Sequence, residues 1–269
     1  MDHSLDIRIP LPREHGAWAM LAVPLLVGIS AAETFSAAFF LLAFTAFGFF
    51  LMRYPLTLAI KSRTAGARAA ALRWSTIYGA ITFVGGAALW VATRLWLLLP
   101  LGALGFASLV LYLLLVARRA EMTTLGEWIG IAGLALGAPG AYLVATRVLN
   151  ETAFALYALN VLYFGGTVSY IKFKVREQPR LGTSVVGLAA RLWAGRATIG
   201  YHTLVVVVIV LSAFIGWVPL LIPLAFVLPM CKVVAGVATR PARLNIPCLG
   251  FVELGFTVAF ALIVLLAYR

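Results

Sequence analysis

Charged residues, and acidic ones above all, are scarce in this chain of 269 residues. Only 9 residues are Asp or Glu, charged residues make up 11% of the chain, and hydrophobic residues make up 63%. Soluble domains have about 25% charged and about 45–50% apolar residues. So large an apolar excess cannot be buried in a soluble core, whose size is limited by surface-to-volume scaling. The composition therefore excludes an ordinary soluble domain and predicts one integral membrane domain over residues 1–269.

Cysteines and enzyme motifs are also scarce. Cys231 and Cys248 are the only cysteines, and we predict two free, buried thiols because a reducing compartment disfavours a disulfide. No apolar run precedes a cleavage site in the first sixteen residues, which indicates no removable signal peptide. The chain has no phosphate loop, nucleophile elbow, zinc-protease helix or paired-carboxylate motif. We therefore expect no metal ion and no cofactor.

Long apolar segments, by contrast, are abundant. A membrane helix needs about 20 mostly apolar residues, and nine segments approach that length. Pro139 predicts a kink in the fifth segment, and Pro219, Pro223 and Pro229 interrupt the eighth. The expected fold is an all-α integral membrane protein, a bundle of about nine transmembrane helices at 16–32, 35–52, 74–92, 95–116, 125–146, 152–171, 198–216, 218–236 and 248–267.

The basic residues predict how the bundle is oriented. With the N-terminus in the cytoplasm and the C-terminus outside, all Lys and Arg residues except Arg94, Arg147 and Arg269 fall on the cytoplasmic side, as the positive-inside rule requires. The net charge of +12 is then explained by topology, and no nucleic-acid partner is expected. Two basic interfacial loops, at about 53–73 and 172–197, are expected to form short amphipathic helices that attract anionic lipid headgroups.

Ionisable side chains at membrane depth are costly and often functional, and here they gather toward the predicted cytoplasmic helix ends. Arginine and lysine in such a cluster favour a phosphate, diphosphate or carboxylate, although helix-end cations also serve as simple anchors. We expect Glu253 to pair with a basic residue, His202 to be a satisfied interface histidine, and Asp2, Asp6, Glu33, Glu121 and Glu151 to be solvated. The candidates for anion contact are Arg13, Arg53, Lys61, Arg63, Arg118, Lys172 and Lys174, with Glu14 and His15 as acid–base candidates.

The opening of the chain resembles the signature of the YwiC-like bacterial membrane proteins. The resemblance rests on Pro12-Arg-Glu-His-Gly-Ala-Trp-Ala-Met-Leu-Ala-Val-Pro-Leu-Leu-Val-Gly28, and Arg53-Tyr-Pro-Leu and Lys61-Ser-Arg63 fit it. It implies a multi-pass protein of the bacterial cytoplasmic (inner) membrane and does not by itself imply a reaction.

A more distant resemblance is to the UbiA prenyltransferases, which also have nine helices, an internal N-terminus and long cytoplasmic loops after helices two and six. Local similarities are Arg13…Pro24…Gly28, Arg118-Arg119 before Thr123, and Tyr170…Glu177…Gly182-Thr-Ser184. Those enzymes use aspartates in both loops to hold Mg²⁺, which carries a prenyl diphosphate.

This chain departs from that pattern in both loops. The first has no acid between Arg53 and Arg73, and the second has only Glu177, with Lys174 and Gln178 where aspartates are expected. Because Mg²⁺ needs carboxylate or phosphate oxygens, an enzyme on this scaffold would be prenyltransferase-like and metal-independent. Lysines and arginines would then replace the charge of the metal; alternatively, the scaffold is reused without catalysis.

Three functions follow as hypotheses. The first is a UbiA-like bundle that binds an anionic amphipathic ligand, an isoprenoid or lipid phosphate, at its cytoplasmic face, with membrane lipids as its surroundings. The second is a transporter or exporter of a small anion, which broken helices weakly support. The third is a non-catalytic assembly protein whose basic loops dock an acidic partner. The sequence leaves the oligomeric state open.

Overall fold

The computed structural model describes residues 10–12, 15–181, 187–239 and 245–269, and for His15 it describes the backbone alone. All regular structure in these residues is helical. A π-helical turn (Phe173–Glu177) and a 3-10 turn (Gln178–Leu181) extend the seventh helix. The α-helices are α1 (His15–Ser30), α2 (Ala38–Lys61), α3 (Ala65–Thr93), α4 (Leu98–Ala117), α5 (Thr124–Ala135), α6 (Gly137–Thr146), α7 (Glu151–Lys172), α8 (Leu188–Ala194), α9 (Arg196–Phe214), α10 (Ile222–Ala238) and α11 (Ile246–Ala267).

Seven helical segments of the described chain are long and apolar enough to cross a membrane, with α5 and α6 counted as one segment. Two shorter apolar helices are Gly16–Ser30 and Ile222–Ala238. Large apolar side chains such as Phe83, Phe214 and Leu220 point outward, as lipid-facing side chains do and those of a soluble protein rarely do in such number. The prediction of an all-α, multi-pass membrane protein is confirmed, whereas nine crossings and their orientation stay predictions.

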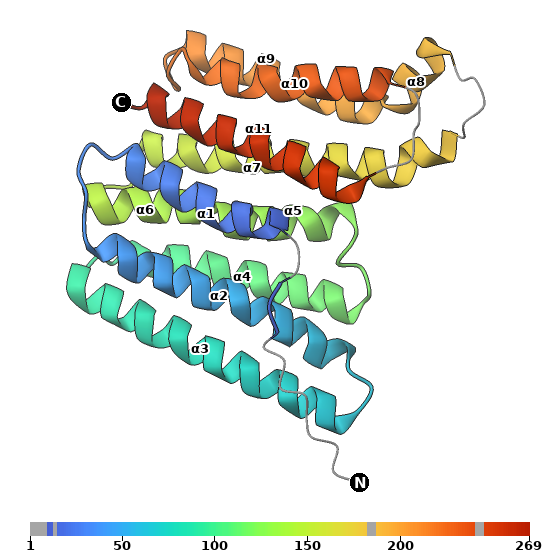
Figure 1. The fold of residues 1–269 in the computed structure, drawn as a ribbon. Coiled ribbons are helices and arrows are strands. Elements are labelled where there is room, and N and C mark those ends of the chain that lie inside the picture. The colour runs from blue at the N-terminus through green and yellow to red at the C-terminus, as the bar shows by residue number, and fades with distance from the viewer. Residues whose placement is uncertain (1–9, 13–14, 182–186, 240–244) are drawn as a thin grey trace.

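The long helices lie side by side and alternate in direction along the chain (Figure 1). At one edge α3 packs closely along α2, and at the other edge α9 packs on α10. Helix α7 lies in the middle and carries the most completely buried side chains, including Leu156 and Leu159. Helices α2, α4 and α7 end at the same end of the molecule where α3, α5 and α11 begin (Figure 1). We call this the basic end, because Lys61, Arg118 and Lys172 lie at those helix termini.

The predicted interfacial loop at 53–73 is much shorter than expected. Helix α2 continues to Lys61 and α3 begins at Ala65, so that only Ser62, Arg63 and Thr64 lie between them. Thr64 caps α3 by accepting a hydrogen bond from the amide of Ala67, as N-cap threonines do. The prediction of this loop was wrong because charged residues were taken as the end of a helix, whereas an α-helix can continue past the hydrocarbon.

The second predicted loop, 172–197, agrees better with the structure. After the π-helical and 3-10 turns, the described chain resumes with α8, a short helix without buried residues that contains Arg191. Val185, Val186 and the Gly182–Ser184 segment lie outside the described residues. Whether α8 lies at a membrane interface stays a prediction.

The predicted kink at Pro139 corresponds to the division between α5 and α6 at Leu136. Proline has no amide hydrogen to donate to the carbonyl of Ala135, four residues earlier, so the regular helix is interrupted there. The eighth predicted segment begins later than expected, at Ile222, with Pro223 in its first turn and Pro229 inside it. Proline fits the first turn because amides there have no helical partner.

Candidate functional site

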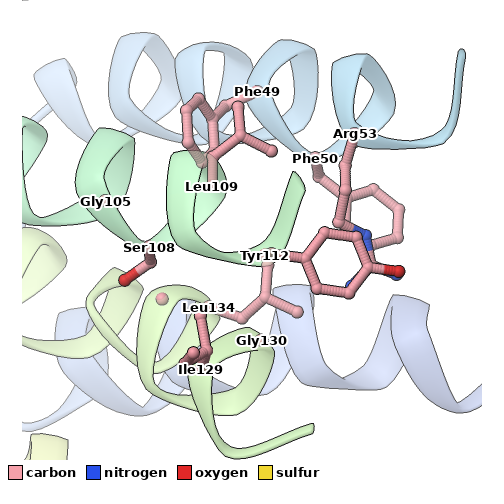
Figure 2. Close-up of a pocket in the computed structure, with 11 residues that line it drawn as sticks. Phe49, Phe50, Arg53, Gly105, Ser108, Leu109, Tyr112, Ile129, Gly130 and Leu134 are labelled. Carbon is pink, nitrogen blue, oxygen red and sulfur yellow. The ribbon is translucent and has the colours of Figure 1, made fainter. Parts of the chain in front are cut away.

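Arg53, one of the predicted anion contacts, lines a cavity. Helix α2 places it one turn after Phe49, in a small pocket between α2, α4 and α5. Its guanidinium carbon lies 5.0 Å from the ring centroid of Tyr112 on α4, and Figure 2 shows the two side chains side by side at one end of the pocket. Gly130 of α5 borders the guanidinium, and a Cβ there would lie in ordinary contact with Nη1, at 3.6 Å.

The pocket around Arg53 adjoins a far larger apolar groove of about 720 Å³. The two cavities share Phe49, Gly105, Gly133 and Leu134. We call the larger one the α3–α4 groove, since α3 and α4 form its two sides while α2, α5 and α6 form most of its floor. Its lining residues include Leu42, Thr45, Phe49 and Met52 of α2, Gly79, Phe83, Gly86 and Trp90 of α3, Leu98, Gly102, Gly105 and Phe106 of α4, and Gly133, Gly137 and Gly140 beyond them.

Glycines create much of the space in this groove. A Cβ on Gly102 would meet no atom within 4 Å, and one on Gly105 would only touch Leu136 at 3.9 Å. Gly133 differs, because its Cβ would lie 2.9 Å from the Cβ of Ser108. The glycines of the fifth predicted segment therefore allow close helix packing in part, whereas those of α4 leave the groove open.

Three of the other predicted anion contacts, all of them lysines, already have partners. Lys61 forms an ion pair with Glu121, and Lys172 forms one with Glu127. Lys174 donates a hydrogen bond of 3.3 Å to the carbonyl of Gly236. Each of these lysines thus contacts a separate group instead of lining one shared cavity.

The remaining candidates for anion contact or acid–base chemistry are either exposed or outside the described part of the chain. Arg63 and Arg118 are exposed. Arg13 and Glu14 lie outside the described residues, as does the side chain of His15. Anion binding by these residues and acid–base roles for Glu14 and His15 stay predictions.

Two acidic residues at the basic end differ from the sequence interpretation. Glu121, in the loop between α4 and α5, was expected to be solvated, but its side chain is only 11% exposed and it pairs with Lys61 at the end of α2. The hydrogen bond from Lys61 lowers the pKa of Glu121. Glu127 was not singled out; the available signal was an acid in the first turn of a membrane helix, opposite a lysine in the last turn of α7.

A second charged cluster lies inside the α7–α11 side of the molecule. Lys232 donates to both carboxylate oxygens of Glu253, at 2.6 and 2.7 Å, and the two side chains are only 9% and 6% exposed. The ammonium also lies 4.8 Å from the ring centroid of Tyr170 and 4.7 Å from that of Phe256. The prediction that Glu253 pairs with a basic residue is confirmed.

His202 is buried beside this cluster. Its Nδ1 lies 2.8 Å from the carbonyl oxygen of Thr198, which is the arrangement of a satisfied histidine. Cys231 and Cys248 are free but exposed, so the prediction of buried thiols was wrong. Cys231 lies on α10 and Cys248 lies on α11, and both thiols are on the outer surface of the bundle.

The positions that would carry aspartates in a UbiA enzyme serve another purpose here. Gln178, like Lys174, donates to the carbonyl of Gly236 at 3.3 Å. Both side chains thus satisfy the C-terminal end of α10, where helix carbonyls lack partners and cations are favoured. The ammonium of Lys174 cannot ligate Mg²⁺ and repels it, and Gln178 offers a neutral amide oxygen in place of a carboxylate. The described residues contain no group of three His, Cys, Asp or Glu placed to hold a metal ion. These residues do not fit a UbiA-type magnesium site.

Comparison with known proteins shows a similarity to one family. Residues 11–142 match the family model of the YwiC-like proteins, and the uncharacterized protein YwiC of Bacillus subtilis is 25% identical over 177 residues, 62% of this chain and 68% of that protein. The chain is thus similar to the YwiC-like proteins over residues 11–142. An uncharacterized protein of Haemophilus influenzae is 24% identical over 263 residues, covering 97% of this chain and 99% of the relative. The matched residues 11–142 contain Arg53 and the whole lining of the α3–α4 groove.

One solved structure shares the fold. It is that of digeranylgeranylglyceryl phosphate synthase in membranes, with a TM-score of 0.53 and 13% identity, and the match covers 94% of this chain and 91% of the other. The distant UbiA resemblance is thereby confirmed for the fold. At this identity the likeness carries no information about the reaction.

Proposed function

We propose that this protein binds an anionic amphipathic ligand, an isoprenoid or lipid phosphate, and that Arg53 contacts its anion. The observation that supports this proposal is the position of a half-buried guanidinium at the end of a large apolar groove. An amphipathic phosphate matches this arrangement, because its charged end would meet the guanidinium and its hydrocarbon would lie in the apolar groove.

The geometry around Arg53 suits an oxyanion. The ring of Tyr112 lies against the guanidinium, and this stacking contributes about 0.5–2 kcal/mol. Because the ring occupies one face, the N–H groups in the guanidinium plane remain free to donate to phosphate oxygens in the bidentate manner that arginine favours. Ser108 and Tyr112 are the other polar side chains among the described residues that line this pocket.

The proposal concerns binding and contains no bond-breaking step. Neither Ser108 nor Tyr112 is accompanied by a base among the described residues that line the pocket, and a hydroxyl nucleophile would need one. A metal-independent, prenyltransferase-like reaction would need further groups, for which Glu14 and His15 are the candidates from the sequence.

The topology is part of the same proposal. We propose nine crossings, the seven long segments together with α1 and α10, in the bacterial inner membrane with the basic end in the cytoplasm. Support comes from the basic residues at the ends of α2, α4 and α7, which share one end of the bundle. The headgroup of the ligand would then lie in the cytoplasmic leaflet.

Arg53→Gln tests the anion contact, with Arg68→Gln on α3 as the matched control because Arg68 is exposed and outside both cavities. Farnesyl phosphate would be titrated into the purified protein in detergent and the bound fraction followed by native mass spectrometry. A charge-assisted hydrogen bond contributes about 1.5–3 kcal/mol, so we expect binding to Arg53→Gln to be about 10- to 100-fold weaker. The control should bind within about twofold of the parent. Equal binding by both variants would refute the role of Arg53.

A further inference from the structure

We infer that a single hydrocarbon chain of the ligand lies along the α3–α4 groove from Arg53 to Trp90, and that it enters sideways from the bilayer between α3 and α4. This inference rests on the proposed function for the position of the anion. It adds the path, the length and the route of entry of the apolar part.

The opening follows from how α3 is attached. Helix α3 packs closely along α2 and makes far fewer contacts with α4, its successor in the chain. Phe83 of α3 and Phe106 of α4 both line the groove and are 76% and 59% exposed. In a bilayer such exposed rims meet lipid chains, so the groove opens to the hydrocarbon without passing through water.

The length of the groove matches the hydrocarbon thickness of one leaflet of a bilayer. Along α2, Arg53 and Leu42 are eleven residues apart, and along α3 the same separation joins Gly79 and Trp90. At a rise of ~1.5 Å per residue both distances are about 16 Å. The hydrocarbon core of a bilayer is ~30 Å thick, so a chain as long as half that thickness fills the groove.

The groove favours a chain over a protein helix as its occupant. A transmembrane helix crosses the full hydrocarbon thickness, whereas this groove runs along about half of it and ends at a charged side chain. The volume of about 720 Å³ lies within the ~300–1,000 Å³ range of pockets for small ligands. Gly102 and Gly105 keep the α4 side free of side chains, and any residue with a long side chain there would occupy the path of the ligand.

Gly102→Leu tests the path of the chain, and Gly255→Leu on α11 is the matched control. A Cβ at either glycine meets no atom within 4 Å, but Gly255 is outside the groove. Binding of lysophosphatidic acid and farnesyl phosphate would be measured together with thermal unfolding, which reports whether each variant is folded. We expect Gly102→Leu to weaken binding of both ligands at least tenfold, with the control within about twofold.

The outcomes separate this inference from the proposed function. Weaker binding in Arg53→Gln with unchanged binding in Gly102→Leu would overturn the groove and leave the anion site. Unchanged binding in both would overturn both. Should Gly102→Leu fail to fold, Gly102→Ala and Gly105→Ala offer milder obstruction, and graded weakening in these folded variants is expected; parental binding by both would overturn the inference.

The direction of the chain has its own test in the fluorescence of Trp90. In a variant that keeps Trp90 and has phenylalanine at the other tryptophans, lysophosphatidic acid would carry a nitroxide either at the chain end or beside the glycerol. We expect stronger quenching from the chain-end label, because Trp90 lies far from Arg53 along the groove. Equal or reversed quenching would overturn the orientation, and a dimer that excludes the lipid from Trp90 would identify a second copy as the occupant and overturn the inference.

Discussion

On both sides of the molecule a cation lies against a tyrosine ring, but the surroundings differ. Arg53 lies 5.0 Å from the ring of Tyr112 and faces a cavity that leads into the α3–α4 groove. Lys232 lies 4.8 Å from the ring of Tyr170 and is held by both oxygens of Glu253 in a buried cluster. Among α7, α10 and α11 the cation is thus neutralised by a buried carboxylate. Between α2 and α4 the cation borders open volume that a ligand could occupy.

The glycines repeat this contrast. Gly102 on the groove side has open space where a side chain would begin, whereas a Cβ on Gly236 of α10 would overlap the hydroxyl of Tyr170. Small residues bring helices together in one region and leave volume in the other. We therefore propose that the α2–α4 side binds the ligand and that the α7–α11 side stabilises the fold, and both proposals can be tested by substitution.

The largest effect is expected from breaking the buried pair. Glu253→Leu leaves the Lys232 ammonium buried without its partner, which costs about 3–5 kcal/mol of unfolding free energy. The double variant Lys232→Met/Glu253→Leu should regain most of this loss, because an apolar pair of similar volume avoids desolvating charge. Unfolding of the purified protein in detergent by heat or denaturant measures both. A single variant as stable as the parent would show that the pair does not stabilise this side.

A smaller loss is expected from Gly236→Ala, about 1–3 kcal/mol, because the added methyl group must displace the ring of Tyr170. Tyr170→Phe in the same chain should restore part of it by removing the overlapping hydroxyl. Gly102→Ala is the matched control and should stabilise by about 0.5–1 kcal/mol, since alanine is the better helix former. If both alanine variants change the unfolding midpoint equally, the two sides do not differ in packing.

The smallest effect is expected at the ion pair between Lys61 and Glu121. The pKa of Glu121 is lowered in the folded protein from 4.5 by the hydrogen bond from Lys61. The pair therefore stabilises the fold above about pH 4.5 and loses this contribution as the pH falls through the lowered pKa. Lys61 is half exposed, so Lys61→Gln should cost under about 1 kcal/mol at pH 7.

This prediction is checked by comparing the unfolding midpoints of Lys61→Gln and the parent across that pH range. The difference should shrink below pH 4.5, once Glu121 is protonated in both proteins. A difference that stays constant with pH would mean that the lysine acts through packing of its aliphatic stem.

The sequence interpretation succeeded where a property is local. Apolar runs near the length of a bilayer predicted the membrane helices, and Pro139 predicted the interruption between α5 and α6. Glu253 was recognised as a paired acid because an isolated carboxylate at membrane depth is costly. The interpretation failed at residues 53–73, where charges along a continuing helix look the same as charges in a loop.

Sequence alone determined that this chain is an α-helical membrane protein with its basic residues at one end, because hydropathy and helix-end charge are properties of each segment by itself. Tertiary structure decided which cations are already paired. Lys61 meets Glu121 across 60 positions of the chain, and Lys232 meets Glu253 on the next helix. It also decided that open volume lies between α3 and α4, since a cavity is what neighbouring helices leave unfilled and no single segment encodes it.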